Sequence, residues 1–246
     1  MISYVFFDMD GTLLNMGESA FEKEYLKRMV LFFEQRFSGK GKDIAKAVAY
    51  SAEAMKRNDG KQSNEAVFWQ AFEKASGLKR AAMEPLFLQY YGTDYAHIGD
   101  DYVADADMQA LVHLLQEKGY GLVVATNPLV PQIANRERVR WAGVSDVDWL
   151  EITSFEGYSS CKPQVQFYQQ ICDKLQIAPQ QCLMVGNSLV DDLPATELGM
   201  AFYLMLNEDS EEACKAYTGQ KGNRRDLLEW VQSWPIIAGS EAAQEL

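Results

Sequence analysis

Two aspartates one residue apart close a short apolar run near the N-terminus, in the segment VFFDMDGT at residues 5–12. Residues 2–7 have the composition of a buried strand, and Gly11 gives the backbone the freedom to turn after it. Asp8 and Asp10 are therefore expected to converge where the strand ends. Two crowded carboxylates need a cation or a proton, so the pair predicts a nucleophile, an acid/base group and a divalent metal in one site. The alternative is an acidic corner between a strand and a turn, without a catalytic role.

Three further segments carry polar side chains at the ends of predicted elements. Thr126 and Asn127 follow an apolar run, and Lys162 stands just before a predicted helix. The segment GNSLVDD at residues 186–192 follows another apolar run. Ligands of an open parallel sheet bind at the carboxyl ends of its strands. These segments and the aspartate pair are therefore expected to meet at one edge of a sheet.

Each of the three segments also has a plain structural interpretation. Thr126 and Asn127 fit a helix cap, and Lys162 on its own is typical of a solvated surface lysine. Asp191 and Asp192 would stabilise the N-terminus of a following helix through its dipole. The order and spacing of the segments, together with the sheet edge that they share, favour a joint site over coincidence.

From about residue 103 onward, helix and strand patterns alternate, which is typical of a parallel sheet covered on both faces. The predicted strands are 2–7, 120–125, 149–155, 182–185 and 201–206. The predicted helices of this part are 107–118, 131–141, 163–175, 193–198 and 225–234, and the tail after residue 239 is expected to fray. The expected fold class is α/β, with a Rossmann-like parallel sheet core flanked by helices.

A helical block follows the first strand and is rich in Ala, Glu, Lys, Met and Phe. Four helices are predicted in it, over 18–36, 43–56, from 63 or 64 to 77, and 80–91. Pro85 marks either the true first turn of the last helix or a break in it. The block indicates an inserted α-helical cap domain over residues 17–95. Residues 1–16 and 96–246 then form the α/β core domain.

The composition excludes several classes of function. The 246 residues carry a formal net charge of −12, and the pI is near 4.7. Such acidity argues against a sequence-independent nucleic-acid binder and against docking on anionic membranes. No run has the length of a membrane-spanning helix, and the N-terminus lacks the pattern of a signal peptide. Four cysteines without a C-x-x-C pair and two histidines disfavour a zinc site. We expect reduced thiols in a cytoplasmic protein, and the oligomeric state stays open.

Together the four segments resemble the motifs of the haloacid dehalogenase-like (HAD) hydrolase superfamily. Those motifs are D-x-D-G-T, a Ser or Thr at a strand end, a Lys before a helix, and an acidic loop that usually begins Gly-Asp. The matching positions are 8–12, 126, 162 and 186–192, and the chain looks most similar to the phosphatase branch with an α-helical cap. The resemblance implies a Mg²⁺-dependent phosphatase that hydrolyses a small phosphorylated metabolite through an aspartyl-phosphate intermediate.

The resemblance also implies a role for each motif residue. Asp8 would be the nucleophile, and Asp10 would protonate the leaving oxygen and then activate water. Thr126, with main-chain amides near Asn127, would hold the phosphoryl oxygens. Lys162 would neutralise charge on the phosphoryl group and on the nucleophile. Magnesium would bind the Asp8 carboxylate, the main-chain carbonyl of Asp10 and a residue of the fourth segment.

Two positions depart from the family pattern. Asn187 stands where relatives usually carry an aspartate, and an amide oxygen can bind a metal but brings no charge. Asn187 and Asp191 are the predicted metal ligands of this segment, while the choice among them and Asp192 stays open. Asn15 replaces an acidic residue that many relatives carry at the entry to the cap, which bears on cap closure or substrate choice.

Other activities occur within the same superfamily. Dehalogenases and phosphonatases are disfavoured because their first motif lacks the second aspartate, whereas Asp10 is present. A phosphomutase uses the same two aspartates and stays an alternative. A non-catalytic regulator that binds a phosphorylated metabolite is the other alternative, and Asn187 is the residue that motivates it.

Overall fold

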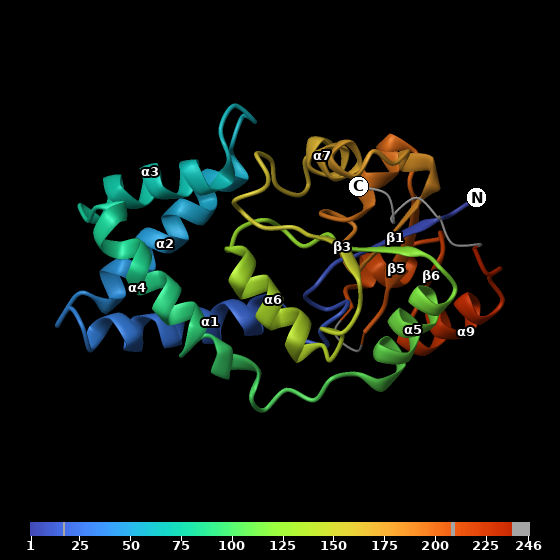
Figure 1. Cartoon of the computed structure of the whole chain (residues 1–246), viewed down its shortest axis with the longest axis horizontal. Helices are drawn as coiled ribbons and strands as arrows, with labels where there is room; N and C mark the ends of the chain where they lie inside the picture. Colours follow the sequence, from blue (N-terminus) through green and yellow to red (C-terminus); the bar gives the residue numbers. More distant parts are fainter. Residues whose placement is uncertain (17, 208–209, 238–246) are drawn as a thin grey trace, which may run out of the picture.

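The computed structural model of the chain describes residues 1–16, 18–207 and 210–237 (Figure 1), so the predicted fraying of the tail lies outside the described residues. The strands are β1 (Tyr4–Phe7), β2 (Gly121–Val124), β3 (Trp149–Ile152), β4 (Cys182–Gly186), β5 (Ala201–Met205) and β6 (Lys221–Gly222). The α-helices are α1 (Glu18–Glu34), α2 (Gly41–Lys56), α3 (Asn64–Ser76), α4 (Arg80–Gly92), α5 (Ala106–Glu117), α6 (Gln132–Trp141), α7 (Val165–Leu175), α8 (Glu212–Ala216) and α9 (Arg224–Gln232). Short 3₁₀ helices are η1 (Ala96–Gly99), η2 (Pro179–Gln181) and η3 (Leu193–Leu198).

The strands form a parallel sheet in the order β3-β2-β1-β4-β5-β6. β1 is central, and its Tyr4 lies in register with Gly121 of β2 on one side and Cys182 of β4 on the other. The chain therefore builds the sheet outward from β1 in both directions, and the switch point lies at the carboxyl end of β1. Ligands of such sheets bind in the crevice at that point. The expected α/β fold class, a Rossmann-like parallel sheet flanked by helices, is confirmed.

Alternate side chains of each strand enter two apolar layers. Val5 and Phe7 of β1 face the layer that holds Leu111 of α5 and Leu227 of α9. Phe6 faces the opposite layer, which holds side chains of α7 and η3. In Figure 1, α7 lies on one side of the sheet, and α5 and α9 lie together on the other. Burial on both faces explains why the strands are continuous apolar runs in the sequence.

Helices α1 to α4, which we call the helical insertion, follow β1 and precede α5 in the chain. They lie beside the sheet (Figure 1). The predicted cap at Ser63 is present, because its side-chain oxygen accepts a hydrogen bond from Ala66 N at 3.2 Å. Aromatic side chains of α3 and α4, including Phe72 and Phe87, pack with ring centroids 5.4 Å apart. The division into a cap over 17–95 and a core stays a prediction.

Several elements differ from the expectation. Pro85 lies inside α4, so it marks neither the first turn nor a break. The helix continues through it because Met83, Phe87 and Tyr90 around it are buried in the apolar cluster, and this packing outweighs the lost backbone bond. The predicted helix 193–198 is the 3₁₀ helix η3, which has a proline in its first turn. α8 and β6 were not predicted, since five and two residues are too short for a periodic pattern.

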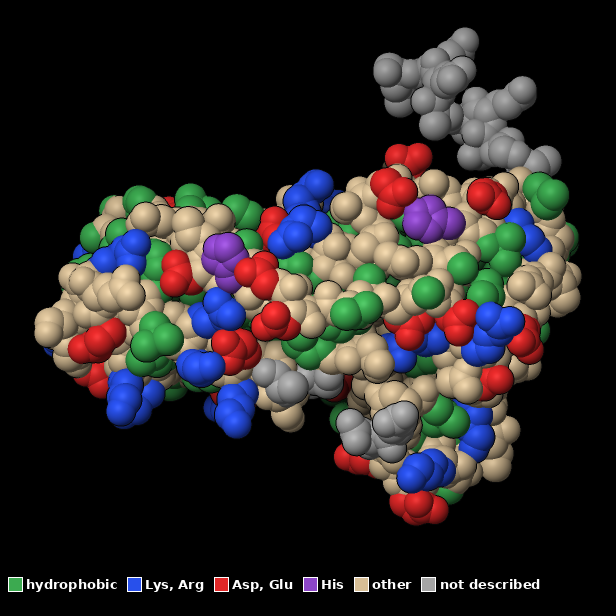
Figure 2. Space-filling view, turned by 90° about the horizontal axis from the view of Figure 1, so that it is seen from below, with side chains coloured by type: hydrophobic (Ala, Val, Ile, Leu, Met, Phe, Trp, Pro, Cys, Tyr) green, Lys and Arg blue, Asp and Glu red, His purple; other side chains and the backbone are tan. Residues whose placement is uncertain are grey.

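Within the described ranges, no helix combines the length and the apolar character that a membrane crossing requires. On the face shown in Figure 2, basic and acidic side chains are interspersed over both the helical insertion and the rest of the molecule. All four cysteines are buried and free, as expected for reduced thiols.

Candidate active site

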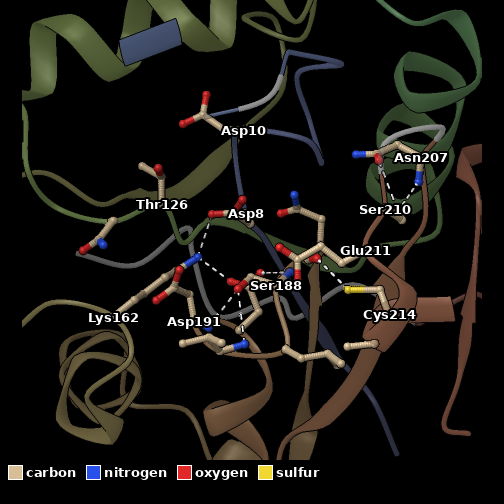
Figure 3. A pocket seen from close by; sticks show the side chains of 16 residues that line it. Asp8, Asp10, Thr126, Lys162, Ser188, Asp191, Asn207, Ser210, Glu211 and Cys214 are labelled. Atoms are coloured by element: carbon tan, nitrogen blue, oxygen red, sulfur yellow. Dashed lines mark hydrogen bonds and ion pairs between the residues drawn. The ribbon is translucent and has the colours of Figure 1, made fainter. Parts of the chain in front are cut away.

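The loop after β1 turns two carboxylates to the same side. Asp8 still belongs to the sheet ladder, since its N–H donates to Val185 O at 2.9 Å. Met9 is fully buried, whereas Asp8 and Asp10 both line the cavity at the strand ends (Figure 3). Gly11 then takes a φ of +74°, a conformation that side chains with a Cβ rarely adopt. The turn that the sequence predicted is thus built on this glycine.

A cavity of about 400 Å³ lies beyond the carboxyl ends of β1, β2 and β4. The structure brings every predicted site residue to its wall: Asp8, Asp10, Thr126, Asn127, Lys162, Asn187 and Asp191, with Asp192 beside them. They come from four separate segments, and the parallel sheet brings these segments to one edge. Their catalytic and metal-binding roles stay predictions.

Lys162 lies between two carboxylates. Its Nζ is 2.6 Å from Asp8 Oδ1 and 2.6 Å from Asp192 Oδ1 (Figure 3). Burial by itself lowers the pKa of Lys162, but Asp192 and Asp8 outweigh burial and hold it well above its ordinary value. Lys162 is therefore a permanent buried cation against the proposed nucleophile, and the interpretation as a solvated surface lysine is wrong.

Asp192 forms an ion pair with Lys162, and its position is fixed by hydrogen bonding within its own loop. Its Oδ2 accepts a hydrogen bond from Ser188 N at 3.0 Å. A Cβ on Gly186 would lie 2.2 Å from the same oxygen, so only glycine allows the carboxylate this close to β4. With Oδ1 bound to Lys162, both oxygens of Asp192 are engaged.

Oxygen atoms that suit a divalent cation remain on the other residues of the loops. Asn187 and Asp191 line the cavity with Asp8, and the Asn187 amide packs so tightly against Gly11 that a Cβ there would lie 2.3 Å from Nδ2. Carboxylate, amide and main-chain oxygens are the donors that Mg²⁺ prefers. No three His, Cys, Asp or Glu side chains in the described ranges gather as a metal cluster. The predicted set, which combines carboxylates with the Asn187 amide and the Asp10 main-chain oxygen, has the donor chemistry that Mg²⁺ prefers, and it stays a prediction.

Asp10 forms an ion pair with Arg138 of α6, a residue that the sequence prediction missed. Arg138 is 3% exposed; its Nη2 bonds Asp10 Oδ2, and its Nη1 donates to Asn135 Oδ1 at 3.0 Å. Burial raises the pKa of Asp10, while Arg138 opposes that rise. A raised pKa favours a carboxyl group that carries a proton to a leaving oxygen. Helical spacing places Arg138 on the face of Ala134 and Asn135, and a charge on a buried face needs a partner.

The segment after β2 presents a hydroxyl and an amide to the same cavity. Thr126 is 3% exposed and lies above Lys162 in Figure 3. Its main-chain oxygen accepts a hydrogen bond from Thr153 Oγ1 at 2.6 Å, which fixes the loop. Asn127 Oδ1 is buried and has no hydrogen-bond partner among the described atoms. The segment is therefore part of the cavity wall, and an acceptor in it is left for a ligand.

Arg224 of α9 stabilises the loop after β1 through hydrogen bonds to its main chain. The sequence prediction missed this residue as well. Its guanidinium donates to Thr12 O at 2.8 Å and to Gly11 O at 3.3 Å. It also donates to Asn15 Oδ1 at 3.2 Å. Asn15 thus contacts this buried arginine through its amide oxygen, and its effect on cap closure or substrate choice stays a prediction. No local sequence signal marks a contact between residues more than 200 positions apart.

Comparison with known proteins supports the motif resemblance. A family model described as haloacid dehalogenase-like hydrolase matches residues 2–198. A phosphoglycolate phosphatase of Pasteurella multocida is 28% identical over 204 residues, which cover 79% of this chain and 81% of that protein. A HAD phosphatase structure from Thermococcus onnurineus, 18% identical, matches 96% of this chain and all of its own with a TM-score of 0.59.

The fold is also shared with an enzyme of another activity. An L-2-haloacid dehalogenase from Xanthobacter autotrophicus, 15% identical, matches 95% of this chain and 99% of its own with a TM-score of 0.53. Fold alone therefore does not separate phosphatase from dehalogenase. The family match nevertheless confirms the motif resemblance and the expectation of an enzyme, and the family and the curated relative together support a phosphoric monoester hydrolase. The chain belongs to the haloacid dehalogenase-like hydrolase family.

Proposed function

We propose that this hydrolase is a Mg²⁺-dependent phosphatase that cleaves a small phosphorylated metabolite through an aspartyl-phosphate on Asp8. The observation that carries the proposal is the buried Lys162 ammonium, 2.6 Å from Asp8 and beside Asp10 in one cavity. A dianionic phosphoryl group that approaches Asp8 needs such a fixed cation. The presence of Asp10, with its own buried partner, favours the phosphatase over a dehalogenase.

In this mechanism Lys162 binds Oδ1 of Asp8, and Oδ2 attacks the phosphorus atom. Asp10 donates a proton to the leaving oxygen, and an alcohol departs. Asp10 then takes a proton from a water molecule, which hydrolyses the aspartyl-phosphate and regenerates Asp8. Thr126 and the amides near Asn127 hold the phosphoryl oxygens through both steps.

Asp8, the main-chain oxygen of Asp10 and an oxygen of Asn187 or Asp191 would hold the magnesium ion. Bound there, the cation would neutralise charge on the phosphoryl group during transfer. Lys162 and Asp192 would remain outside the metal site, because they bind each other at 2.6 Å. We further propose that residues 17–95 act as a cap over residues 1–16 and 96–246.

The test is phosphate release from p-nitrophenyl phosphate by purified Asp8→Asn protein. We expect kcat to fall on the order of 10³-fold or more, since the nucleophile is lost. Asp43→Asn, an exposed change of the same kind on α2, should leave kcat unchanged. Chelation by EDTA should abolish activity, and added Mg²⁺ should restore it. Undiminished turnover in Asp8→Asn would sink the proposal.

Two alternatives are separated by the product. A phosphomutase would yield an isomerised sugar phosphate in place of free phosphate. A non-catalytic regulator, motivated by the uncharged Asn187 against Gly11, would bind a phosphorylated metabolite and Mg²⁺ without turnover. A panel of phosphorylated metabolites, assayed for both binding and free phosphate, distinguishes the three.

A further inference from the structure

A second cavity, of about 280 Å³, adjoins the first and lies between the helical insertion and the loop after β2. Asp10, Thr126 and Asn127 line both cavities, so they form the boundary between them. In the proposed reaction the leaving oxygen lies at Asp10. The organic part of the substrate therefore points from this boundary into the second cavity.

The walls of the second cavity are mainly apolar. Phe21 and Tyr25 of α1 contribute aromatic rings, and α2 contributes small aliphatic side chains such as Val48 and Ala52. Leu129, from the loop after β2, lines the cavity from the opposite side. A dry apolar cavity of about 150 Å³ holds a benzene molecule. The volume here therefore suits a group larger than one benzene ring.

The cationic side chains that line this cavity, Arg138 and Lys56, already have partners. Arg138 pairs with Asp10, and its guanidinium lies 4.5 Å from the centre of the Phe21 ring. Lys56 Nζ is 3.0 Å from Glu53 Oε1. Glu22 adds a further carboxylate to the lining, which thus holds more carboxylates than cations.

A second anionic group on the substrate would be unfavourable in this cavity. It would have to share Arg138 with Asp10, or Lys56 with Glu53, and it would lose its hydration to an apolar wall. Arg138 Nε has no hydrogen-bond partner among the described atoms, and it can donate to a neutral acceptor. An uncharged, apolar group satisfies these conditions, and it buries its surface against Phe21 and Tyr25.

We propose that the second cavity binds the leaving group, and that the preferred substrates are phosphomonoesters with an uncharged apolar or aromatic group in place of a carboxylate. The proposal rests on the phosphatase function proposed above. It predicts a specificity opposite to that named for the curated relative, a phosphoglycolate phosphatase.

The first experiment compares kcat/KM for benzyl phosphate, ethyl phosphate and phosphoglycolate. All three esters release an alcohol oxygen, so the comparison reports mainly on the cavity. We expect benzyl phosphate to exceed each of the other two by about tenfold or more. Equal or higher kcat/KM for phosphoglycolate would overturn the proposed specificity while leaving the phosphatase intact. Absence of turnover for all monoesters, p-nitrophenyl phosphate included, would instead refute the proposed function.

The second experiment fills the cavity. Ala52→Phe should lower kcat/KM for benzyl phosphate about tenfold, mainly through KM, and leave ethyl phosphate almost unchanged. Ala82→Phe is the matched control, because Ala82 is exposed on α4 and does not line the cavity. Ala49→Leu, a smaller change at another lining residue, provides a second variant should Ala52→Phe fail to fold. Equal losses for both substrates, or none for benzyl phosphate, would contradict the proposal.

Discussion

At the scale of single residues, Lys162 makes the strongest prediction, because one ammonium holds two carboxylates. Lys162→Met leaves Asp192 buried without its cation, and breaking such a pair costs about 3–5 kcal/mol. Urea unfolding should show this loss. We also expect kcat/KM to fall by about 10² or more, since the positive charge beside Asp8 is lost.

The double variant Lys162→Met with Asp192→Asn separates the two effects. Removing the Asp192 carboxylate should recover most of the free energy of unfolding, because Asp192 is the more deeply buried of the two partners of Lys162, with a side chain 1% exposed against 14% for Asp8. Activity should stay low, because Asp8 still lacks its cation. Recovery of activity in the double variant would contradict a direct role of Lys162 at Asp8.

Gly11 offers a test with a built-in control. Gly11 and Gly39 share a φ of +74°, but a Cβ on Gly11 would meet the Asn187 amide, whereas nothing lies within 4 Å of one on Gly39. Each change to Ala should cost about 1–3 kcal/mol through backbone strain. Only Gly11→Ala should also lower the affinity for Mg²⁺, by about tenfold, because the new Cβ displaces the Asn187 amide. A Mg²⁺ titration of activity measures this affinity. Equal affinity in both variants would contradict a role of Asn187 as a metal ligand.

The residues that the sequence predicted and those that it missed differ in the kind of signal they leave. Asp8 and Lys162 stand at strand and helix ends, where residue type and topology together predict a meeting point. Arg138 and Arg224 are buried and bind groups of the loop after β1. In the sequence, only its position on the helix distinguishes Arg138 from the nearby Arg140. Buried partners of this kind become visible only when the packing of distant elements is known.

At the scale of elements, the start of α3 joins the helical insertion to the sheet part. Asn64 is fully buried; its Nδ2 donates to Ser160 O at 3.2 Å, and its Oδ1 accepts from Asn58 Nδ2 at 2.8 Å. Asn64→Ala leaves these groups without partners and should cost about 1–3 kcal/mol. Ser63→Ala removes only the helix cap and should cost about 1 kcal/mol.

Urea unfolding and KM together decide what this junction does. Asn64→Ala should raise KM, because α2 and the loop after β2 line the second cavity together and depend on their relative placement. Ser63→Ala should leave KM unchanged. An unchanged KM in Asn64→Ala would show that the junction supports stability alone.

Most elements were predictable because their periodic patterns are long. The strands of the sheet and helices such as α2 and α5 agree with the sequence prediction to within a few residues. The prediction at Pro85 was wrong because it considered only the backbone, where proline lacks an N–H donor and disfavours a helix interior. The aromatic side chains of α4 are buried in an apolar cluster, and this tertiary packing outweighs the local preference. β6 pairs with β5, and η3 packs against α7, β4 and β5, so both depend on neighbouring elements rather than on patterns of their own.

At the scale of the whole molecule, the first loop of the site depends on the last helix of the described chain. Arg224 on α9 binds the main-chain oxygens of Gly11 and Thr12, so the N-terminal motif is stabilised from more than 200 residues away. Burial lowers the pKa of Arg224, and the nearby Asp105 carboxylate opposes that fall only in part. A substitution of Arg224 is therefore expected to lower the free energy of unfolding and to disturb the active site.

Arg224→Met should lower the free energy of unfolding by about 2–4 kcal/mol, because several buried carbonyls lose their donor. It should also lower kcat about tenfold, since a loop that is 1 Å out of place misaligns Asp8 and Asp10. Arg225→Met is the matched control, since the neighbouring side chain is 62% exposed and its surface ion pairs contribute at most about 1 kcal/mol. Urea unfolding and steady-state kinetics measure both effects. A stable Arg224→Met protein with normal kcat would show that the loop holds its shape without α9.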